Sequence, residues 1–288
     1  VDLAWSPVVV NATPAVAYRV YRTASADGAS QQELLIATVS ATSYTDTGAT
    51  PQTEAPLSPG SLGVWQLQTP AHAARWGHQA AVISDGTNRY LYVLGGKSDA
   101  AAGYLTTIEV SPIDTSGHLG AFTSSGTNAF PTGRAFFSLA VETAATVAGF
   151  TGVARFFTTG GVIAGAASAE VDFADVTAGG GNAAWTSYAG AGTLGTRAGP
   201  MSVITGDKLF CVGGAAMATD TTFSNVRANG EDLPFNANGA IGSPIQSTAN
   251  ALPAPRALGA LIAGAGFIYF AGGTSDGTDA VQTVYQTF

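Results

Sequence analysis

Four glycine pairs, each placed directly after a short run of large apolar residues, constrain this chain more than any other feature. The runs are YLYVLGG, RFFTTGG, LFCVGG and FIYFAGG, which end at Gly96, Gly161, Gly214 and Gly273. An aromatic residue stands three places before each first glycine, and a large apolar residue stands one place earlier. Short apolar runs that stop at paired glycines are typical of β-strands that approach another backbone closely. Four copies predict a repeated structural unit.

Two further landmarks accompany each glycine pair. An arginine precedes the first glycine by 16 to 26 residues: Arg75, Arg134, Arg197 and Arg256. A glycine followed five positions later by an aromatic residue occurs in GSLGVW, GHLGAF, GGNAAW and GEDLPF, and a more polar strand is expected between each pair and this element. Successive pairs lie 53 to 65 residues apart. The landmarks therefore predict four short strands in each repeat, which is the number of strands in a β-propeller blade.

The pattern resembles the Kelch repeat, especially the secreted bacterial variety with its Gly-x-Leu-Gly-x-Trp element. The resemblance covers about residues 58 to 288 and implies an all-β propeller of four-stranded blades. Two segments depart from it: TVAGFTGVA lengthens the first hairpin of the second repeat, and NANGAIGSPIQSTANALPA separates Phe235 from Arg256 in the third. We interpret both segments as inserted loops.

The order of the landmarks predicts how the propeller closes. The aromatic strand around Trp65 precedes the first arginine, whereas the last repeat, which runs to VQTVYQTF, lacks its own aromatic strand. We therefore expect a four-bladed ring closed by about residues 62 to 68, because a lent strand removes exposed edges. The alternative is an excerpt from an array of six or seven blades. In either case residues 61–288 form the propeller, and the Pro-rich stretch 51–60 is a linker.

Residues 1–50 resemble the early strands of a fibronectin type III domain. The likeness rests on the Leu3-x-Trp5 pair and on the strand YRVYR at Tyr18 to Arg22. It implies a β-sandwich in which Trp5 is a core residue. The first strand and the closing strand of that family are missing, so the segment is expected to be a partial sandwich.

Charge and cysteine content exclude some classes of function. The formal net charge is −8, only 10% of residues are charged, and no basic cluster occurs, which disfavours a nucleic-acid partner or an anionic membrane surface. The longest apolar window, Ala257 to Gly273, contains five glycines and predicts two buried strands joined by a turn at residues 264–266 rather than a membrane span. The single cysteine, Cys211, is expected to be a buried small hydrophobe.

The sequence predicts no catalytic group, metal site or cofactor. Its three histidines, His72, His78 and His118, show no metal-ligand spacing, and a packing role is expected for His78. Galactose oxidase is a Kelch propeller with an immunoglobulin-like module, but its copper ligands and Cys–Tyr crosslink do not carry over to this chain.

The most notable polar set is the four arginines themselves. Equivalent positions on successive blades lie on a ring, so Arg75, Arg134, Arg197 and Arg256 are candidate ligands for a carboxylate or sulfate group. The favoured alternative is that each arginine ties a loop to the adjacent blade through backbone carbonyls. The two insertions are candidate partner-contact loops, with Glu142 and Phe150 in the first, and Asn236, Asn238, Gln246 and Asn250 in the second.

These features favour a non-enzymatic extracellular module that is secreted, displayed on a cell or carried by a virus particle. Its partner would be a protein or carbohydrate surface, or copies of itself in an assembly, with neither nucleic-acid binding nor membrane insertion. Adhesion, surface assembly and binding are the expected roles. Two alternatives stay open: a glycan-active enzyme with a pocket on one propeller face, and a structural subunit of a filament or virus particle.

Overall fold

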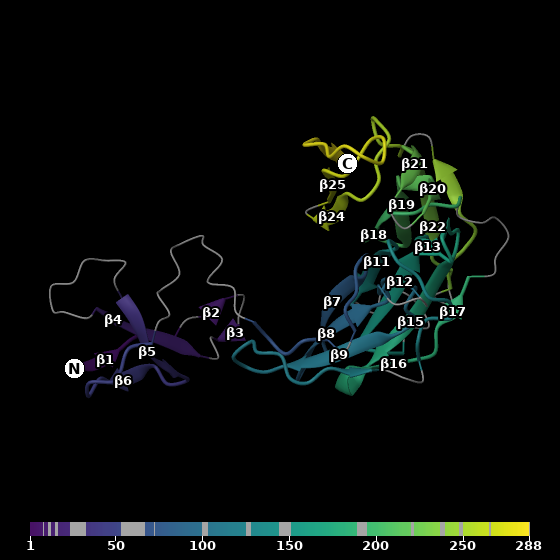
Figure 1. Ribbon diagram of the computed structural model, residues 1–288. Helices are drawn as coiled ribbons and strands as arrows, with labels where there is room; N and C mark the ends of the chain where they lie inside the picture. Colours follow the sequence, from purple (N-terminus) through teal and green to yellow (C-terminus); the bar gives the residue numbers. More distant parts are fainter. Residues whose placement is uncertain are drawn as a thin grey trace. The chain divides into compact units, whose positions relative to one another are not determined.

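The computed structural model describes residues 1–7, 9–10, 13–14, 17–23, 33–52, 67–71, 73–99, 103–124, 128–143, 151–188, 195–219, 222–236, 240–247, 250–264 and 266–287. These residues form two compact units (Figure 1). The first unit is Val1–Gln68 with Thr115–His118, and the second is Thr69–Asp114 with Leu119–Phe288.

The first unit is a small antiparallel β-structure of paired strands. Its strands are β1 (Asp2–Ala4), β2 (Val9–Val10), β3 (Thr13–Pro14), β4 (Tyr18–Thr23), β5 (Glu33–Val39) and β6 (Ser43–Thr45). Strand β4 pairs with β5, β1 with β6, and β2 with β3. Val20, Leu35 and Ile36 are buried between them. Trp5 packs edge-on against Tyr18, with their ring centroids 5.4 Å apart, as expected for a small apolar core.

The second unit contains four antiparallel sheets, which we call blades 1 to 4. Blade 1 consists of β7 (Gln79–Ser84), β8 (Arg89–Leu94), β9 (Ile108–Ile113) and β10 (Thr123–Ser124). Blade 2 consists of β11 (Ser138–Glu142), β12 (Ala154–Thr159), β15 (Val171–Thr177) and an outer strand in two pieces, β16 (Gly181–Asn182) and β17 (Thr186–Ser187). The turn η1 (Ala178–Gly180) joins β15 to β16.

Blade 3 repeats this order with β18 (Met201–Thr205), β19 (Lys208–Val212), β22 (Gly230–Pro234) and β23 (Ile245–Ser247). Blade 4 consists of three strands among the described residues, β24 (Ala260–Gly264), β25 (Phe267–Ala271) and β26 (Val284–Thr287). Two short hairpins lie outside the blade sheets, β13 (Val162–Ile163) with β14 (Ala166–Ala167), and β20 (Ala215–Ala218) with β21 (Phe223–Val226). The arrangement is an all-β, four-blade propeller, as the repeats predict.

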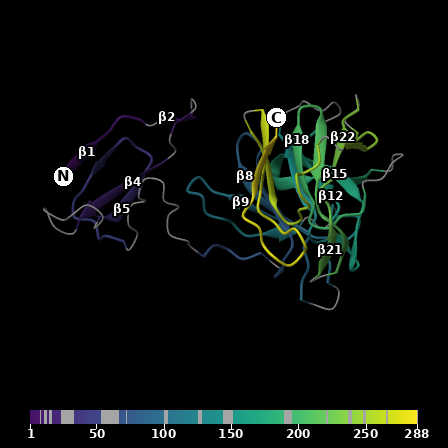
Figure 2. The same cartoon turned by 90° about the horizontal axis from the view of Figure 1, so that it is seen from above.

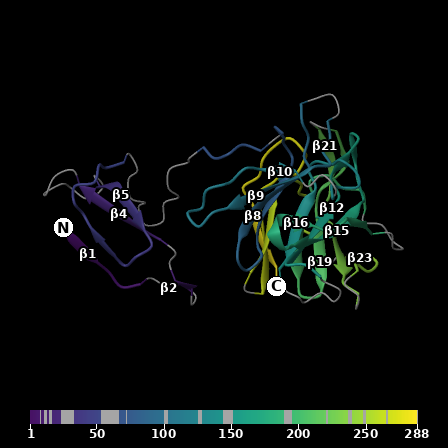
Figure 3. The same cartoon turned by 90° about the horizontal axis from the view of Figure 1, so that it is seen from below.

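The core lies between successive blades rather than inside any one of them. Tyr92 of blade 1 packs on Phe156 of blade 2, Phe157 of blade 2 lies in one cluster with Leu209 of blade 3, and Phe210 of blade 3 lies in one cluster with Phe270 of blade 4. The yellow strands of blade 4 lie beside the green strands of blade 3 in the view from above (Figure 2), and the blue and teal strands of blades 1 and 2 are neighbours in the view from below (Figure 3). Opposite faces of the sheets of blades 2 and 3 thus serve different neighbours.

The glycine pairs mark where one blade meets the next. All eight glycines have a positive φ, which a side chain resists. A Cβ atom on Gly95 would lie 2.9 Å from the carbonyl oxygen of Arg134 in the next blade. The pair therefore ends the second strand and lets the following blade approach closely.

One expectation about the inserted loops cannot be compared with the structure, and another is wrong. Residues 144–150 of the first insertion, which include Phe150, lie outside the described residues. In the third repeat, GEDLPF is β22 with the residue after it, so the expected Gly–aromatic element is wrong there. The outer strand β23 lies instead inside the segment we interpreted as a loop, and Ile241 and Gly242 take the places that Leu119 and Gly120 hold in blade 1.

Closure of the ring stays a prediction. Residues 62–66, with Trp65, lie outside the described residues, and Leu67 is almost fully exposed. Val82 on β7 and Ile262 on β24 both face away from their neighbouring blades and are 58% and 66% exposed. The two strands predicted in the window from Ala257 to Gly273 are confirmed as β24 and β25. Their predicted burial is wrong for β24, in which no residue is buried, because no described blade covers one face of this sheet. No helix in the described part of the chain has the length and hydropathy of a membrane-spanning segment.

Candidate functional site

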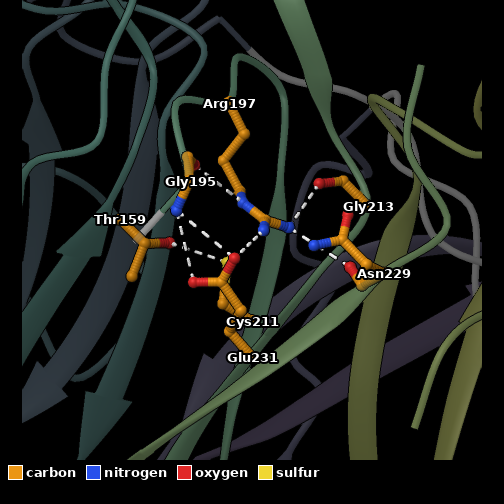
Figure 4. Close-up of polar contacts among 7 residues, drawn as sticks. All are labelled: Thr159, Gly195, Arg197, Cys211, Gly213, Asn229 and Glu231. Carbon is orange, nitrogen blue, oxygen red and sulfur yellow. Dashed lines mark hydrogen bonds and ion pairs between the residues drawn. The ribbon is translucent and has the colours of Figure 1, made fainter. Parts of the chain in front are cut away.

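The four arginines each stand just before the first strand of their blade, where the chain passes the glycine pair. Figure 4 shows the third of them. Arg197 donates from Nη1 to the carbonyl oxygen of Gly213 at 2.8 Å and from Nε to that of Gly195 at 3.1 Å, and it forms an ion pair with Glu231. Both side chains of this pair are fully buried. The guanidinium group thereby fastens the glycine turn to the third strand of the blade.

Arg75 in blade 1 makes the same contacts, whereas Arg134 in blade 2 makes only the ion pairs, because its Nε and Nη1 are buried and have no hydrogen-bond partner among the described residues. Arg75 donates to the carbonyl oxygen of Gly95 at 2.9 Å and pairs with Glu109. Arg134 pairs with Asp172 and, at 2.6 Å, with Glu170. A carboxylate therefore compensates each of these three buried cations, as burial of a charge requires.

The carboxylates share one position in the strand register. Glu109 lies opposite Val93, Asp172 opposite Thr158, and Glu231 opposite Cys211. Each of these partners stands two places before the first glycine of its pair. In blade 4 the same position is taken by Tyr285, opposite Phe270.

Arg256 is consequently the exception among the four arginines. It donates to the hydroxyls of Thr283 at 2.9 Å and Tyr285 at 2.8 Å, and its guanidinium carbon lies 5.3 Å from the centre of the Tyr285 ring. No carboxylate of the described residues contacts it, and its Nε has no hydrogen-bond partner among them. The hydroxyls of Thr283 and Tyr285 and the face of the Tyr285 ring stabilise this cation in place of an anion.

The contacts of the four arginines are thus internal to the protein. They go to side chains of the same repeat and, for Arg75, Arg197 and Arg256, also to backbone carbonyls of that repeat. The role that we favoured, tying a loop to the adjacent blade through backbone carbonyls, stays a prediction. Binding of an external carboxylate or sulfate by the ring stays a prediction.

The loop candidates are partly covered by the described residues. Glu142 ends β11, whereas Phe150 and Asn238 lie outside the described residues. Asn236, Gln246 and Asn250 are exposed. Among these, Asn250 borders a cavity, which the sequence pattern did not predict.

This cavity has a volume of about 860 Å³ and lies between blades 3 and 4. Its apolar wall includes Phe210, Leu252, Ile268 and Phe270, and Tyr285 lies at the β26 side. Lys208 and Asp232 form a polar wall, joined by an ion pair of 3.0 Å. The second oxygen of Asp232, Oδ1, is buried and has no hydrogen-bond partner among the described residues.

The cavity lies where the outer strand segment of a blade packs in the other interfaces. Between blades 1 and 2 the outer segment of blade 2 contributes Trp185, which stacks on Phe156 and packs in a tilted arrangement against Phe130. Between blades 2 and 3 the outer segment of blade 3 contributes Ile241, which is 2% exposed. Blade 4 has no outer strand in the part of the chain that the structure describes, so no described side chain fills the equivalent space.

The remaining reactive side chains are less distinctive. Cys211 is fully buried, as expected, and burial raises the pKa of its thiol. Partial burial and the nearby Arg75 cation lower the pKa of His78. The described residues contain no group of three histidine, cysteine or acidic side chains placed to hold a metal ion, and His72 lies outside them.

Comparison with known proteins gives the fold. No protein-family model matches the sequence. No curated protein matches it either. Among solved structures, the chain is similar to one described as the structure of YjhT, with a TM-score of 0.52 and 15% sequence identity over 76% of this chain and 67% of that one. At this identity the likeness supports the propeller fold alone, and the finer Kelch and fibronectin assignments stay predictions.

Proposed function

We propose that the chain is a non-enzymatic, extracellular binding module for adhesion or surface assembly, and that it takes an extended polypeptide strand at the outer edge of blade 4. The observation that carries the proposal is the cavity of about 860 Å³ beside β26. The low lysine content and the Ala, Gly, Thr and Ser bias are consistent with a secreted protein.

The first support is the open edge of β26. This strand pairs with β25 alone among the described residues, so its second row of backbone N–H and C=O groups faces outward. An exposed edge of this kind is a template for an added strand. Main-chain hydrogen bonds to β26 would supply affinity without requiring a particular sequence.

The second support is the shape and chemistry of the cavity next to that edge. The cavity wall formed by Phe210, Ile268 and Tyr285 suits an apolar side chain of the incoming strand. That side chain would take the place that Trp185 has between blades 1 and 2. The free Oδ1 of Asp232 offers an acceptor for a polar group of the same strand. A strand of the pattern Gly-x-Leu-Gly-x-aromatic meets both requirements.

A labelled peptide of the sequence GSLGVWQLQ, identical to residues 60–68, is the probe that tests this proposal. Its binding is measured by fluorescence anisotropy to the full chain and to the full chain with Trp65→Ala, in which the chain's own copy lacks the anchor. We expect binding that is stronger for the Trp65→Ala chain. The peptide with alanine for its tryptophan should bind at least about 10-fold more weakly, since a buried aromatic anchor dominates such contacts.

Two matched variants place the probe in the cavity. The chain has only two lysines, so Lys208→Ala, on the cavity wall, is compared with Lys97→Ala in blade 1. Lys208→Ala should weaken peptide binding, and Lys97→Ala should leave it unchanged. Absence of peptide binding to both chains contradicts the proposal. Binding of an oligosaccharide that Lys208→Ala weakens would instead assign the cavity to a carbohydrate.

A further inference from the structure

We infer that blade 4 of one chain packs against blade 1 of a second copy, so that the chains associate head to tail through the two faces at the ends of the blade series. This contact uses the sheet faces and not the β26 edge or its cavity, and it therefore goes beyond the proposed strand binding. Three observations support it, each of which extends to blade 4 a contact that the inner blades make.

The first observation concerns the apolar residues before the glycine pairs. In each internal interface, the aromatic residue three places before the first glycine shares a cluster with the apolar residue four places before the glycine of the next blade. These pairs are Tyr92 with Phe156, Phe157 with Leu209, and Phe210 with Ile268. Two members of the pattern lack such a counterpart among the described residues: Tyr269 in blade 4 and Leu91 in blade 1.

Burial follows this pairing in five of the six paired residues, and the sixth, Ile268, borders the cavity and is partly buried. Tyr92, Phe157 and Phe210 are at most 6% exposed, and so are Phe156 and Leu209. Tyr269 and Leu91 are each only partly buried. Tyr269 therefore stands on the face that a following blade covers in the rest of the molecule, and Leu91 stands on the face that a preceding blade covers.

The second observation concerns the backbone. The second glycine of each inner pair donates its N–H to the carbonyl oxygen of the next blade's arginine. Gly96 donates to Arg134 at 2.8 Å, Gly161 to Arg197 at 2.9 Å, and Gly214 to Arg256 at 2.7 Å. For Gly273, no such acceptor occurs among the described residues. In blade 1, the Arg75 carbonyl accepts no glycine N–H in the described part of the chain. Arg75 is therefore the arginine whose carbonyl remains available as an acceptor.

The first glycine of the blade 4 pair also lacks the contact that its counterparts make in the described residues. A Cβ atom on Gly95, Gly160 or Gly213 would collide with the carbonyl oxygen of the next arginine. A Cβ atom on Gly272 would meet nothing closer than the carbonyl oxygen of Val281, at 3.7 Å. Blade 4 thus keeps the glycine pair that a following blade requires, although no described residue makes that approach.

The third observation is the apolar character of both faces. Ile262 is 66% exposed on blade 4, and Val82 is 58% exposed on blade 1. The two faces are the complementary halves of an interface that the chain forms three times internally. A second copy supplies the missing half without any new type of contact, whereas an unrelated partner would have to imitate a blade. Because the two faces differ, the contact is heterologous and can propagate into a closed ring or a filament.

Two variants block one face each. Val82→Asp places a charge on the blade 1 face, and Ile262→Asp places one on the blade 4 face. Both positions are exposed, so the fold should tolerate the change. Ile245→Asp is the matched control, because Ile245 is also 58% exposed but lies on β23 of blade 3. Circular dichroism verifies that all three variants fold.

Light scattering coupled to size exclusion measures their mass. The unmodified chain and Ile245→Asp should exceed 28.8 kDa, with a mass that rises with concentration, whereas Val82→Asp and Ile262→Asp should each run as monomers. An equimolar mixture of the two blocked variants should form dimers and nothing larger, because each variant retains one intact face.

Three results overturn the inference: a monomeric unmodified chain, a single blocked variant that still associates, or a mixture that stays monomeric. The first of these would favour closure of the ring within one chain. Peptide binding at the β26 edge is measured separately on both blocked variants. Its persistence in the absence of self-association would leave the proposed strand binding intact, so the two proposals can fail independently.

Discussion

Blades 3 and 4 have the same repeat pattern, but only blade 3 has a described neighbour packed on each of its faces. The first glycines of their pairs, Gly213 and Gly272, have the same φ of 69°. The Gly213 turn is pressed against Arg256 of the following blade, whereas the Gly272 turn is open. In the same way Arg197 is neutralised by Glu231, while Arg256 is met by Tyr285.

This difference separates two kinds of residue. The side chains of the arginine and of its partner on the third strand serve their own blade, since blade 4 retains that contact with Tyr285 in place of the carboxylate. The glycine pair and the aromatic residue before it serve the next blade. Blade 4 also has them, although no described blade packs against them there. Residues retained without a described contact indicate where a partner surface belongs.

The largest effect should come from the buried ion pair of blade 3. Glu231→Gln leaves the Arg197 cation buried without an anion, which should lower the free energy of unfolding by about 3–5 kcal/mol. Tyr285→Phe, at the same register position in blade 4, removes one hydrogen bond to a charged group and should cost about 1.5 kcal/mol. Urea unfolding followed by circular dichroism measures both. Equal losses would show that Arg256 depends on Tyr285 as Arg197 depends on Glu231.

A smaller effect should separate the two glycine pairs. Gly272→Ala introduces only the strain of a left-handed residue, about 1 kcal/mol. Gly213→Ala carries the same strain and also collides with the Arg256 carbonyl, so its loss of stability should be roughly 2 kcal/mol larger. Thermal unfolding of the two variants below the association concentration tests this. A Gly272→Ala variant as unstable as Gly213→Ala would mean that blade 4 is already covered in the single chain.

Much of the fold could be predicted because the same landmarks recur in four repeats, so that each copy supports the interpretation of the others. The apolar runs before the glycines correspond to β8, β12, β19 and β25. The sequence GEDLPF fits the Gly–aromatic pattern although it forms a third strand, because a glycine five residues before an aromatic residue also occurs by chance. The hydrogen bond from Gly242 to the Pro234 carbonyl, which matches the bond from Gly120 to Pro112, fixes the correct alignment, and a search for Gly-x-Leu/Ile-Gly could have found it.

The carboxylate partners of the arginines could not be predicted from spacing. Glu109 follows its first glycine by 14 residues, Asp172 by 12 and Glu231 by 18, because the connections between second and third strands differ in length. Only the strand register places the three at one position. The cavity was equally hidden, because it arises from a strand that blade 4 lacks among the described residues and not from a pattern of residues.

Backbone amide hydrogen exchange at the second glycines tests the central claim most directly. The amides of Gly96, Gly161 and Gly214 should exchange slowly at every protein concentration, since each donates to an arginine carbonyl within the chain. The Gly273 amide should exchange rapidly in dilute solution and become protected as the concentration rises, and Val82→Asp should abolish that protection. A Gly273 amide that is as protected as Gly214 in dilute solution would contradict the account, because blade 4 would then already have its neighbour.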